Sequence, residues 1–312
     1  MNPILGELIK EYEKHIFGQR SNIRLLLTAI LARGHVLLEG VPGTGKTKMV
    51  RTLAQLIGGE YQRIQFTPDL MPSDITGNVI YNMKEGQFDT LKGPIFTHLL
   101  LGDEINRTPA KTQAALLEAM EEKQVTIHGT TYPLLEPFFL VATQNPIEYE
   151  GTYALPEAQQ DRFLFKLMVD YPTLEAEKEV LRQVLQQKNI QNKESEIKQI
   201  MSTQDLLQMQ QEVKEIRVDE AIIDYIAQIV RKTRESTMIR LGASPRAGIA
   251  VLTSSQAWAY LEGREFVTPD DVKRMVIPAM RHRMILAPHI ELEGGTSEQI
   301  IQDVVASIPV PR

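Results

Sequence analysis

A glycine-rich segment near the start of the chain has the composition and spacing of a phosphate-binding loop. The sequence "GVPGTGKT", Gly40 to Thr47, matches the pattern G-x-x-x-x-G-K-[ST], follows a short apolar run and precedes a helical pattern. Glycines allow backbone N–H groups to converge on phosphate oxygens, and the N-terminus of the following helix adds partial positive charge. We expect Lys46 to reach the terminal phosphates of a nucleotide and Thr47 to bind Mg²⁺. The predicted nucleotide contacts of this loop are Gly40, Val41, Pro42, Gly43, Thr44, Gly45, Lys46, Thr47 and Lys48.

Two adjacent carboxylates follow another apolar run. Asp103 and Glu104 in "LLLGDEINR" lie at the expected C-terminal end of a buried strand, the edge at which open α/β sheets bind ligands. Asp103 is suited to hold the metal through water, and Glu104 is suited to accept a proton from an attacking water. A D-E pair after a strand also fits the start of a helix, but the phosphate loop upstream favours a catalytic role.

Two further polar residues lie beside apolar runs. Asn145 in "ATQNP" ends the next expected strand, so we expect it beside Glu104, where it orients the attacking water or contacts the γ-phosphate. The alternative is an asparagine that opens a turn before proline.

Arg162 in "LPEAQQDRF" precedes the mostly apolar run "FLFKLMV". An ion pair with Asp161 or another carboxylate is one explanation for a cation at that place.

These residues require a scaffold of short buried strands alternating with helices. Apolar runs predict strands at residues 35–39, 63–66, 98–103, 138–143 and 164–169, as expected of a parallel α/β core. Two interruptions predict hairpins, with turns at Glu85-Gly86 and at Gly129-Thr130. After residue 170 the pattern changes to long amphipathic helices. We therefore predict an α/β nucleotide-binding core over residues 1–170 and an all-α lid domain over residues 171–312.

The composition limits the classes of function. Lys and Arg number 34 against 40 Asp and Glu, a net charge of −6, so nucleic acid is not expected as a partner. The absence of cysteine excludes disulfides and thiol catalysis and fits a cytoplasmic location. The first residues lack the pattern of a secretory signal, and no stretch reaches the ~20 apolar residues of a membrane helix.

The motifs, in this order, resemble those of the AAA+ ATPases and in detail those of the MoxR family. The stretches that carry the resemblance span most of residues 15–250: "HIFGQ", "LLEGVPGTGKTKMV", "TPDLMPSDITG", "LLLGDEINRTPAKTQAALLEAMEE", "ATQNPIEYEGTYALPEAQQDRF" and "GASPRA". The resemblance implies a P-loop α/β core with inserted hairpins and a C-terminal helical lid. Gly102 departs from the family pattern, which has alanine there, and this predicts a slightly looser strand end.

The resemblance also implies roles for individual residues. Arg162 matches the arginine finger, which acts on a nucleotide bound by the adjacent subunit, and Arg246 matches the sensor 2 arginine, which acts in cis or in trans. Asn145 matches sensor 1. The Walker A and Walker B positions are matched by Lys46, Thr47, Asp103 and Glu104, and the adenine-lining stretch by Ile16, Phe17, Gly18 and Gln19.

The function that this resemblance implies is Mg²⁺-dependent ATP hydrolysis driving chaperone-like remodelling or maturation of a protein partner. Such proteins form rings, commonly hexamers, often with a partner that carries a von Willebrand factor A domain. A different class of function stays open: a scaffold in which ATP orders a ring that docks a partner, with little turnover. A nucleic-acid motor shares the fold, but the acidic balance of the chain argues against it.

Overall fold

A five-stranded parallel sheet forms the centre of the N-terminal half. The computed structural model describes residues 2–146, 153–188 and 197–311. The strands follow the order β2-β5-β8-β1-β9, and every neighbouring pair is parallel. Their bounds are Val36–Glu39 (β1), Tyr61–Gln65 (β2), Leu99–Asp103 (β5), Phe139–Gln144 (β8) and Phe165–Met168 (β9). The predicted parallel core is therefore confirmed, with each strand within two residues of its expected place.

The three central strands, β5, β8 and β1, are buried on both faces, which explains why they are almost continuously apolar. Successive side chains of one strand point to opposite faces, and they enter two different apolar clusters: Leu99 and Leu101 enter one, Leu100 the other. The first cluster includes residues of helices α1 (Pro3–His15), α2 (Arg20–Leu31) and α3 (Lys46–Leu56). The second includes residues of α5 (Ala110–Glu122).

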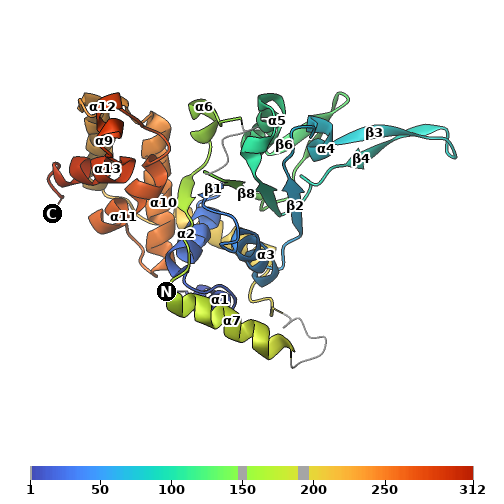
Figure 1. The fold of residues 1–312 in the computed structure, drawn as a ribbon, viewed down its shortest axis with the longest axis horizontal. Helices are drawn as coiled ribbons and strands as arrows, with labels where there is room; N and C mark the ends of the chain where they lie inside the picture. The colour runs from blue at the N-terminus through green and yellow to red at the C-terminus, as the bar shows by residue number, and fades with distance from the viewer. Residues whose placement is uncertain (1, 147–152, 189–196, 312) are drawn as a thin grey trace.

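Two hairpins project from the core, as predicted. The longer one, β3 (Gly77–Asn82) with β4 (Gln87–Lys92), follows the short helix α4 (Pro72–Thr76) and extends away from the body of the protein (Figure 1). The shorter one joins β6 (Gln124–Ile127) to β7 (Thr130–Pro133). Its turn is His128-Gly129, one residue earlier than expected, because Thr130 already pairs with Ile127. Both turn residues have positive φ, 46° and 85°, as tight hairpin turns require.

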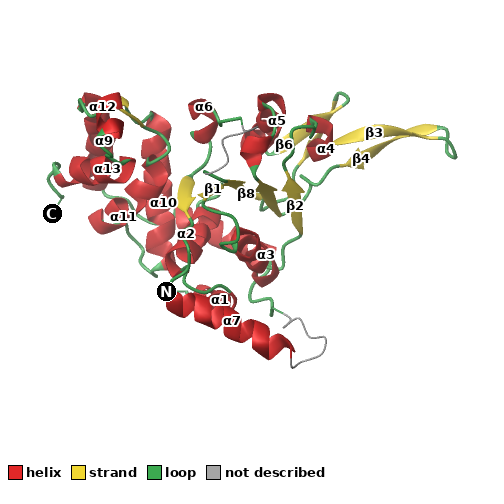
Figure 2. Cartoon of the chain, viewed as in Figure 1, coloured by secondary structure: helices red, strands yellow, loops and turns green. Residues whose placement is uncertain are grey.

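The C-terminal half is mainly helical (Figure 2). Its long helices are α7 (Leu174–Lys188), α8 (Thr203–Lys214), α9 (Glu220–Glu235), α10 (Pro245–Leu261), α11 (Pro269–Met280) and α13 (Ser297–Ala306), with the short α12 (Pro288–Leu292). A small antiparallel pair, β10 (Ile239–Leu241) and β11 (Ile285–Leu286), adds to the predicted helical lid. Among the described residues, no helix has the length and apolar character needed to cross a membrane.

The two halves share one apolar cluster. Residues of α1 to α3 and residues of α8 to α11 belong to the same buried group, and α2 contacts both α8 and α10. The predicted boundary at residue 170 falls between β9 and α7, where the chain leaves the sheet. Two further elements are short: the 3-10 turn η1 (Ile105–Arg107) lies between β5 and α5, and α6 (Glu157–Gln160) lies between β8 and β9.

A buried tyrosine joins α1 to the helix of the phosphate loop, and this contact gives a test of the fold. The hydroxyl of Tyr12 donates a hydrogen bond of 2.6 Å to the carbonyl of Met49 in α3, and Tyr12 is fully buried. Tyr12→Phe should lower the free energy of unfolding by about 1 kcal/mol in urea denaturation, because that hydrogen bond is lost.

Tyr225 provides the matched control. It is 2% exposed, and its hydroxyl has no hydrogen-bond partner among the described residues. Tyr225→Phe should therefore leave the free energy of unfolding unchanged or raise it slightly. Equal losses in the two variants would contradict the role given to the Tyr12 hydrogen bond.

Candidate functional site

The phosphate loop joins the C-terminal end of β1 to the N-terminus of α3. Gly45 adopts the left-handed conformation, with φ at 84°, and caps α3, which begins at Lys46. Gly43 has φ at 82°, and no atom lies within 4 Å of a Cβ added at Gly43 or Gly45. At Gly40 an added Cβ would lie 2.3 Å from the carbonyl oxygen of Val169, so the loop must begin with glycine. The loop is an open cradle of backbone N–H groups at a helix N-terminus, which suits an anion.

The ammonium group of Lys46 lies over this loop. Its Nζ donates hydrogen bonds of 2.6 Å and 2.9 Å to the carbonyls of Gly40 and Val41. Partial burial lowers the pKa of Lys46, and the nearby carboxylates of Asp103 and Glu104 act in the opposite direction. The structure thus brings Lys46 and the two predicted carboxylates together, and phosphate oxygens are suited to replace the two carbonyls as acceptors.

Asp103 is held on both carboxylate oxygens. Its side chain ends β5 and is largely buried; Oδ1 accepts a 2.6 Å hydrogen bond from the hydroxyl of Thr143, and Oδ2 accepts a 2.6 Å bond from Arg63. The Thr143 oxygen in turn accepts a 2.9 Å hydrogen bond from the backbone N–H of Glu104. One threonine of β8 therefore positions both residues of the acidic pair.

Glu104 lies in a left-handed backbone conformation, with φ at 59°, which is uncommon outside glycine and is frequent at functional sites. Its Oε2 accepts a 2.8 Å hydrogen bond from Gln65 and forms a 2.9 Å ion pair with Arg107. Sequence reasoning missed Arg63, Gln65 and Thr143. The available signal was a threonine within an otherwise apolar strand and two polar side chains on the strand that borders β5.

Asn145 follows β8 directly and is 6% exposed. Since β8 lies between β5 and β1, Asn145 is located between the strand end that carries Asp103 and the one that carries the phosphate loop. The predicted proximity to the acidic pair is consistent with this topology. Residues 147–152 of the stretch that carried the family resemblance lie outside the described residues.

The predicted adenine-lining stretch divides between the core and a pocket. Ile16 belongs to the apolar core, and Phe17 is partly buried. Gly18 and Gln19 line a pocket that the lid residues Trp258 and Arg274 also line. A Cβ added at Gly18 would lie 2.9 Å from the Cβ of Ala176, so α7 packs directly on this stretch. Lys48 points towards the same helix: its Nζ lies 3.5 Å from Gln183 Oε1.

Arg162 and Arg246 meet on one carboxylate. Arg162 Nη1 lies 3.2 Å from Glu121 Oε2, and Arg246 Nη2 lies 2.6 Å from Glu121 Oε1. The expected alternative partner of Arg162, Asp161, is engaged elsewhere: it pairs with Arg283 at 2.7 Å. Of the two alternatives, Asp161 or another carboxylate, the second holds: Arg162 pairs with Glu121, because Asp161 faces α11 and its following turn while Arg162 faces the end of α5.

This arginine pair lies at the opposite edge of the sheet from the phosphate loop. Arg162 precedes β9, whose first residue, Phe165, pairs with Val36 at the start of β1. The phosphate loop begins after Glu39, at the other end of β1. A four-residue strand is about 13 Å long. The structure therefore separates Arg162 and Arg246 from Lys46, Asp103 and Glu104 within one subunit.

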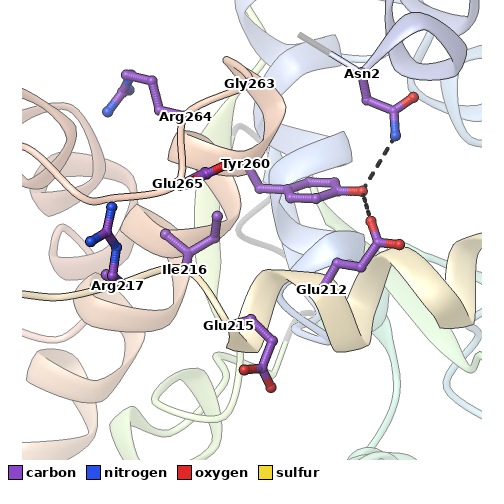
Figure 3. A pocket seen from close by; sticks show the side chains of 9 residues that line it. All are labelled: Asn2, Glu212, Glu215, Ile216, Arg217, Tyr260, Gly263, Arg264 and Glu265. Atoms are coloured by element: carbon purple, nitrogen blue, oxygen red, sulfur yellow. Dashed lines mark hydrogen bonds between the residues drawn. The ribbon is translucent and has the colours of Figure 1, made fainter.

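Another pocket, between the ends of α8 and α10, contains none of the predicted site residues (Figure 3). Its polar side chains bind one another: the phenol of Tyr260 donates to the carboxylate of Glu212, and Asn2 donates to the phenol at 3.4 Å. Burial and the Glu212 hydrogen bond raise the pKa of Tyr260 to about 12. This pocket is separate from the candidate site.

Comparisons with known proteins agree with this geometry. Residues 35–165 match the family model described as "ATPase family associated with various cellular activities (AAA)", and residues 231–304 match an AAA lid domain. The chain is 42% identical to "Chaperone MoxR1" of Mycobacterium tuberculosis, over 99% of this chain and 82% of that protein. The chain belongs to the MoxR family of AAA ATPases.

Two further relatives of this MoxR-family protein cover nearly its whole length. YeaC of Bacillus subtilis is 48% identical over 100% of this chain and 96% of that protein. A crystal structure from Cytophaga hutchinsonii, described as a candidate ATPase, superimposes with a TM-score of 0.92 at 42% identity, covering 99% of this chain and 95% of that one. The structural likeness and the two matched domain models agree with the predicted α/β core and helical lid.

Family membership implies nucleotide binding, and the residues of this site fit a nucleotide with Mg²⁺. The open space over Gly43 and Gly45 leaves room for phosphates. Thr47 and Asp103, the predicted metal-binding residues, carry side-chain oxygens of the kind that Mg²⁺ prefers. At Gly102, where the family resemblance predicts alanine, an added Cβ would lie 3.0 Å from the ring of Phe66, so the ring occupies the space that an alanine methyl group would need.

Thr143 gives a test of how this site is organised. Thr143→Val removes the hydroxyl that binds both Asp103 and the Glu104 N–H while it preserves the shape of the side chain. The Mg²⁺ concentration for half-maximal binding of a fluorescent ATP analogue should rise about tenfold or more, as is usual when a partner of a metal ligand is lost. Thr143→Ser keeps the hydroxyl and should bind as the parent does. Equal binding by Thr143→Val and the parent would exclude this role.

Proposed function

We propose that this protein hydrolyses ATP with Mg²⁺ in a ring of identical subunits and uses the cycle to remodel or mature a protein partner. The observation that carries the proposal is the separation of the site into two parts. Lys46, Asp103 and Glu104 lie at the carboxyl edge of the sheet, and Arg162 and Arg246 lie at the amino edge. A complete site then requires two subunits.

Within one subunit, the residues at the carboxyl edge of the sheet bind ATP and activate the attacking water. The loop N–H groups and Lys46 would hold the phosphates of ATP, and Thr47 and Asp103 would hold Mg²⁺. Mg²⁺ supplies neutralisation of phosphate charge when it is bound. Glu104 accepts a proton from the attacking water, and Asn145 orients that water. Release of Glu104 from Gln65 or Arg107 frees its carboxylate for this task.

Arg162 and Arg246 act on the nucleotide of the neighbouring subunit. Their guanidinium groups stabilise charge on the transferred phosphoryl group, as arginine fingers do. Since both arginines contact the same Glu121 carboxylate, we assign both to the same neighbouring phosphate, which makes sensor 2 act in trans. A heterologous contact of this kind, repeated around an axis, closes a ring, and six subunits is the number we propose from the family resemblance.

The partner is a protein in this proposal. The relative from M. tuberculosis is named a chaperone. The tip and strands of the β3–β4 hairpin expose Met83 at 88% and Phe88 at 74%, apolar surface that suits contact with another polypeptide. We also propose that the partner carries a von Willebrand factor A domain, which rests on the family resemblance. We propose a cytoplasmic location because the chain contains no cysteine.

Two substitutions separate ATP binding from hydrolysis. Lys46→Ala should reduce ATP binding to near the limit of detection, because the cation that neutralises the terminal phosphates is lost. Glu104→Gln should bind ATP like the parent and release phosphate at least a hundredfold more slowly, because the base is lost. Isothermal titration and a phosphate-release assay measure the two effects. Parental turnover by Glu104→Gln would refute its role, and a parent without measurable turnover would favour the nucleotide-gated scaffold.

The assignment of Arg162 to the neighbouring site predicts complementation. Arg162→Ala should keep ATP binding and lower hydrolysis by up to the ~10³-fold range known for arginine fingers. When Arg162→Ala and Lys46→Ala proteins are mixed and exchange subunits, some interfaces join an intact loop to an intact arginine. Hydrolysis by the mixture should exceed the sum of the separate proteins.

The control for this experiment is to verify that labelled subunits exchange, by measuring fluorescence energy transfer between them. If exchange occurs and the mixture gains no activity, Arg162 does not act on the neighbouring nucleotide. It then acts on the nucleotide of its own subunit or only stabilises the fold. The ion pair with Glu121 would then be sufficient to explain why an arginine occupies position 162.

A further inference from the structure

Glu121 is the carboxylate that contacts both arginines of the pair. It lies in the last turn of α5, and each of its two carboxylate oxygens contacts a different arginine, Arg162 at 3.2 Å and Arg246 at 2.6 Å. Glu121 is 36% exposed, with Arg162 at 31% and Arg246 at 52%, so the cluster is open to a neighbouring molecule. Carboxylate and phosphate oxygens are bound by guanidinium groups in the same way.

The surrounding surface has an excess of positive charge. Five cations line the pocket around the arginine pair: Arg33, Lys123, Arg162, Arg246 and Arg283. Two carboxylates oppose them, Glu121 and Asp161. His35 also lines the pocket, but burial lowers its pKa to about 4, so it carries no charge at neutral pH. The pocket therefore keeps a net positive charge that favours a further anion.

The two carboxylates differ in how firmly they are held. Asp161 pairs with Arg283 at 2.7 Å, accepts a hydrogen bond of 3.1 Å from Ser244, and its backbone carbonyl binds Arg283 as well. The Arg283 side chain is only 4% exposed. Glu121 instead contacts two partly exposed arginines, and ion pairs of that kind are weak because water screens them. Glu121 is thus the carboxylate that an external anion displaces.

We propose that Glu121 is an internal competitor for the terminal phosphate of the neighbouring subunit's ATP. In the separate subunit it keeps Arg162 and Arg246 together and neutralises part of their charge. When a neighbouring nucleotide arrives, the phosphate replaces the carboxylate, so Glu121 sets the ATP concentration at which subunits associate. This inference rests on the proposed ring and adds to it a residue that tunes its assembly.

Glu121→Gln tests the inference, because the amide keeps the shape of the side chain and removes its charge. Assembly is followed by sedimentation velocity during titration with a non-hydrolysable ATP analogue and Mg²⁺. The analogue concentration for half-maximal assembly should fall about threefold to tenfold, the range expected when two screened ion pairs no longer compete. Glu122→Gln is the matched control, since it removes the same charge from the adjacent exposed position and should assemble as the parent does.

The double variant Glu121→Gln with Arg162→Ala separates competition from a general charge effect. If Glu121 acts through the arginine pair, the gain from Glu121→Gln should shrink in the Arg162→Ala background, a coupling that independent residues do not show. Thermal unfolding of each variant verifies that the fold is intact.

The outcomes distinguish this inference from the proposed function. Assembly of the parent with no change in Glu121→Gln, or with a need for more analogue, overturns the competitor role and leaves the ring intact. A change of the same size in Glu122→Gln also overturns it. A parent that binds the analogue and never assembles contradicts the proposed ring, and the inference fails with it.

Discussion

The parallel direction of five strands is the constraint on which the candidate site depends. Because all five strands run the same way, their carboxyl ends meet at one edge, and the phosphate loop, Asp103 and Asn145 follow three adjacent strands there. The same constraint places the residue before each strand at the opposite edge, which is where Arg162 lies. A topology with antiparallel neighbours would place Arg162 beside the loop of its own subunit.

The charges at the carboxyl edge are held by neutral and cationic side chains from the neighbouring strands. Thr143 of β8 orients the acidic pair from one side, and Arg63 with Gln65 of β2 contact it from the other. Arg63 donates to both Asp103 and Gln65, so the hydrogen bonds form one connected group. A carboxylate buried as deeply as Asp103 needs such partners, since an unpaired buried charge is strongly unfavourable.

The parts of this structure that depend on local pattern were predictable, and the parts that depend on distant partners were not. The buried strands and the loop-to-helix context of Lys46 follow from apolar runs and glycine spacing, which act over a few residues. The shared partner of Arg162 and Arg246 did not follow, because Glu121 is 41 residues from Arg162 and 125 from Arg246 in the chain. The turn at His128-Gly129 lies one residue before the predicted turn, because its position depends on the pairing of Ile127 with Thr130 across the hairpin.

Helix α5 connects the two edges and thereby constrains how subunits can meet. It begins at Ala110, shortly after the acidic pair, and ends at Glu122, beside the arginine pair; thirteen helical residues span about 20 Å. The acidic pair and Arg162 thus belong to the same α/β core, at opposite ends of α5, while Arg246 comes from α10. An interface that completes a site must join the carboxyl edge of one subunit to the amino edge of the next. In the proposed assembly this interface is heterologous, so the two end subunits of an open chain each keep one free half-site until the assembly closes on itself. In this proposal, closure into a ring is the arrangement that leaves no half-site unused.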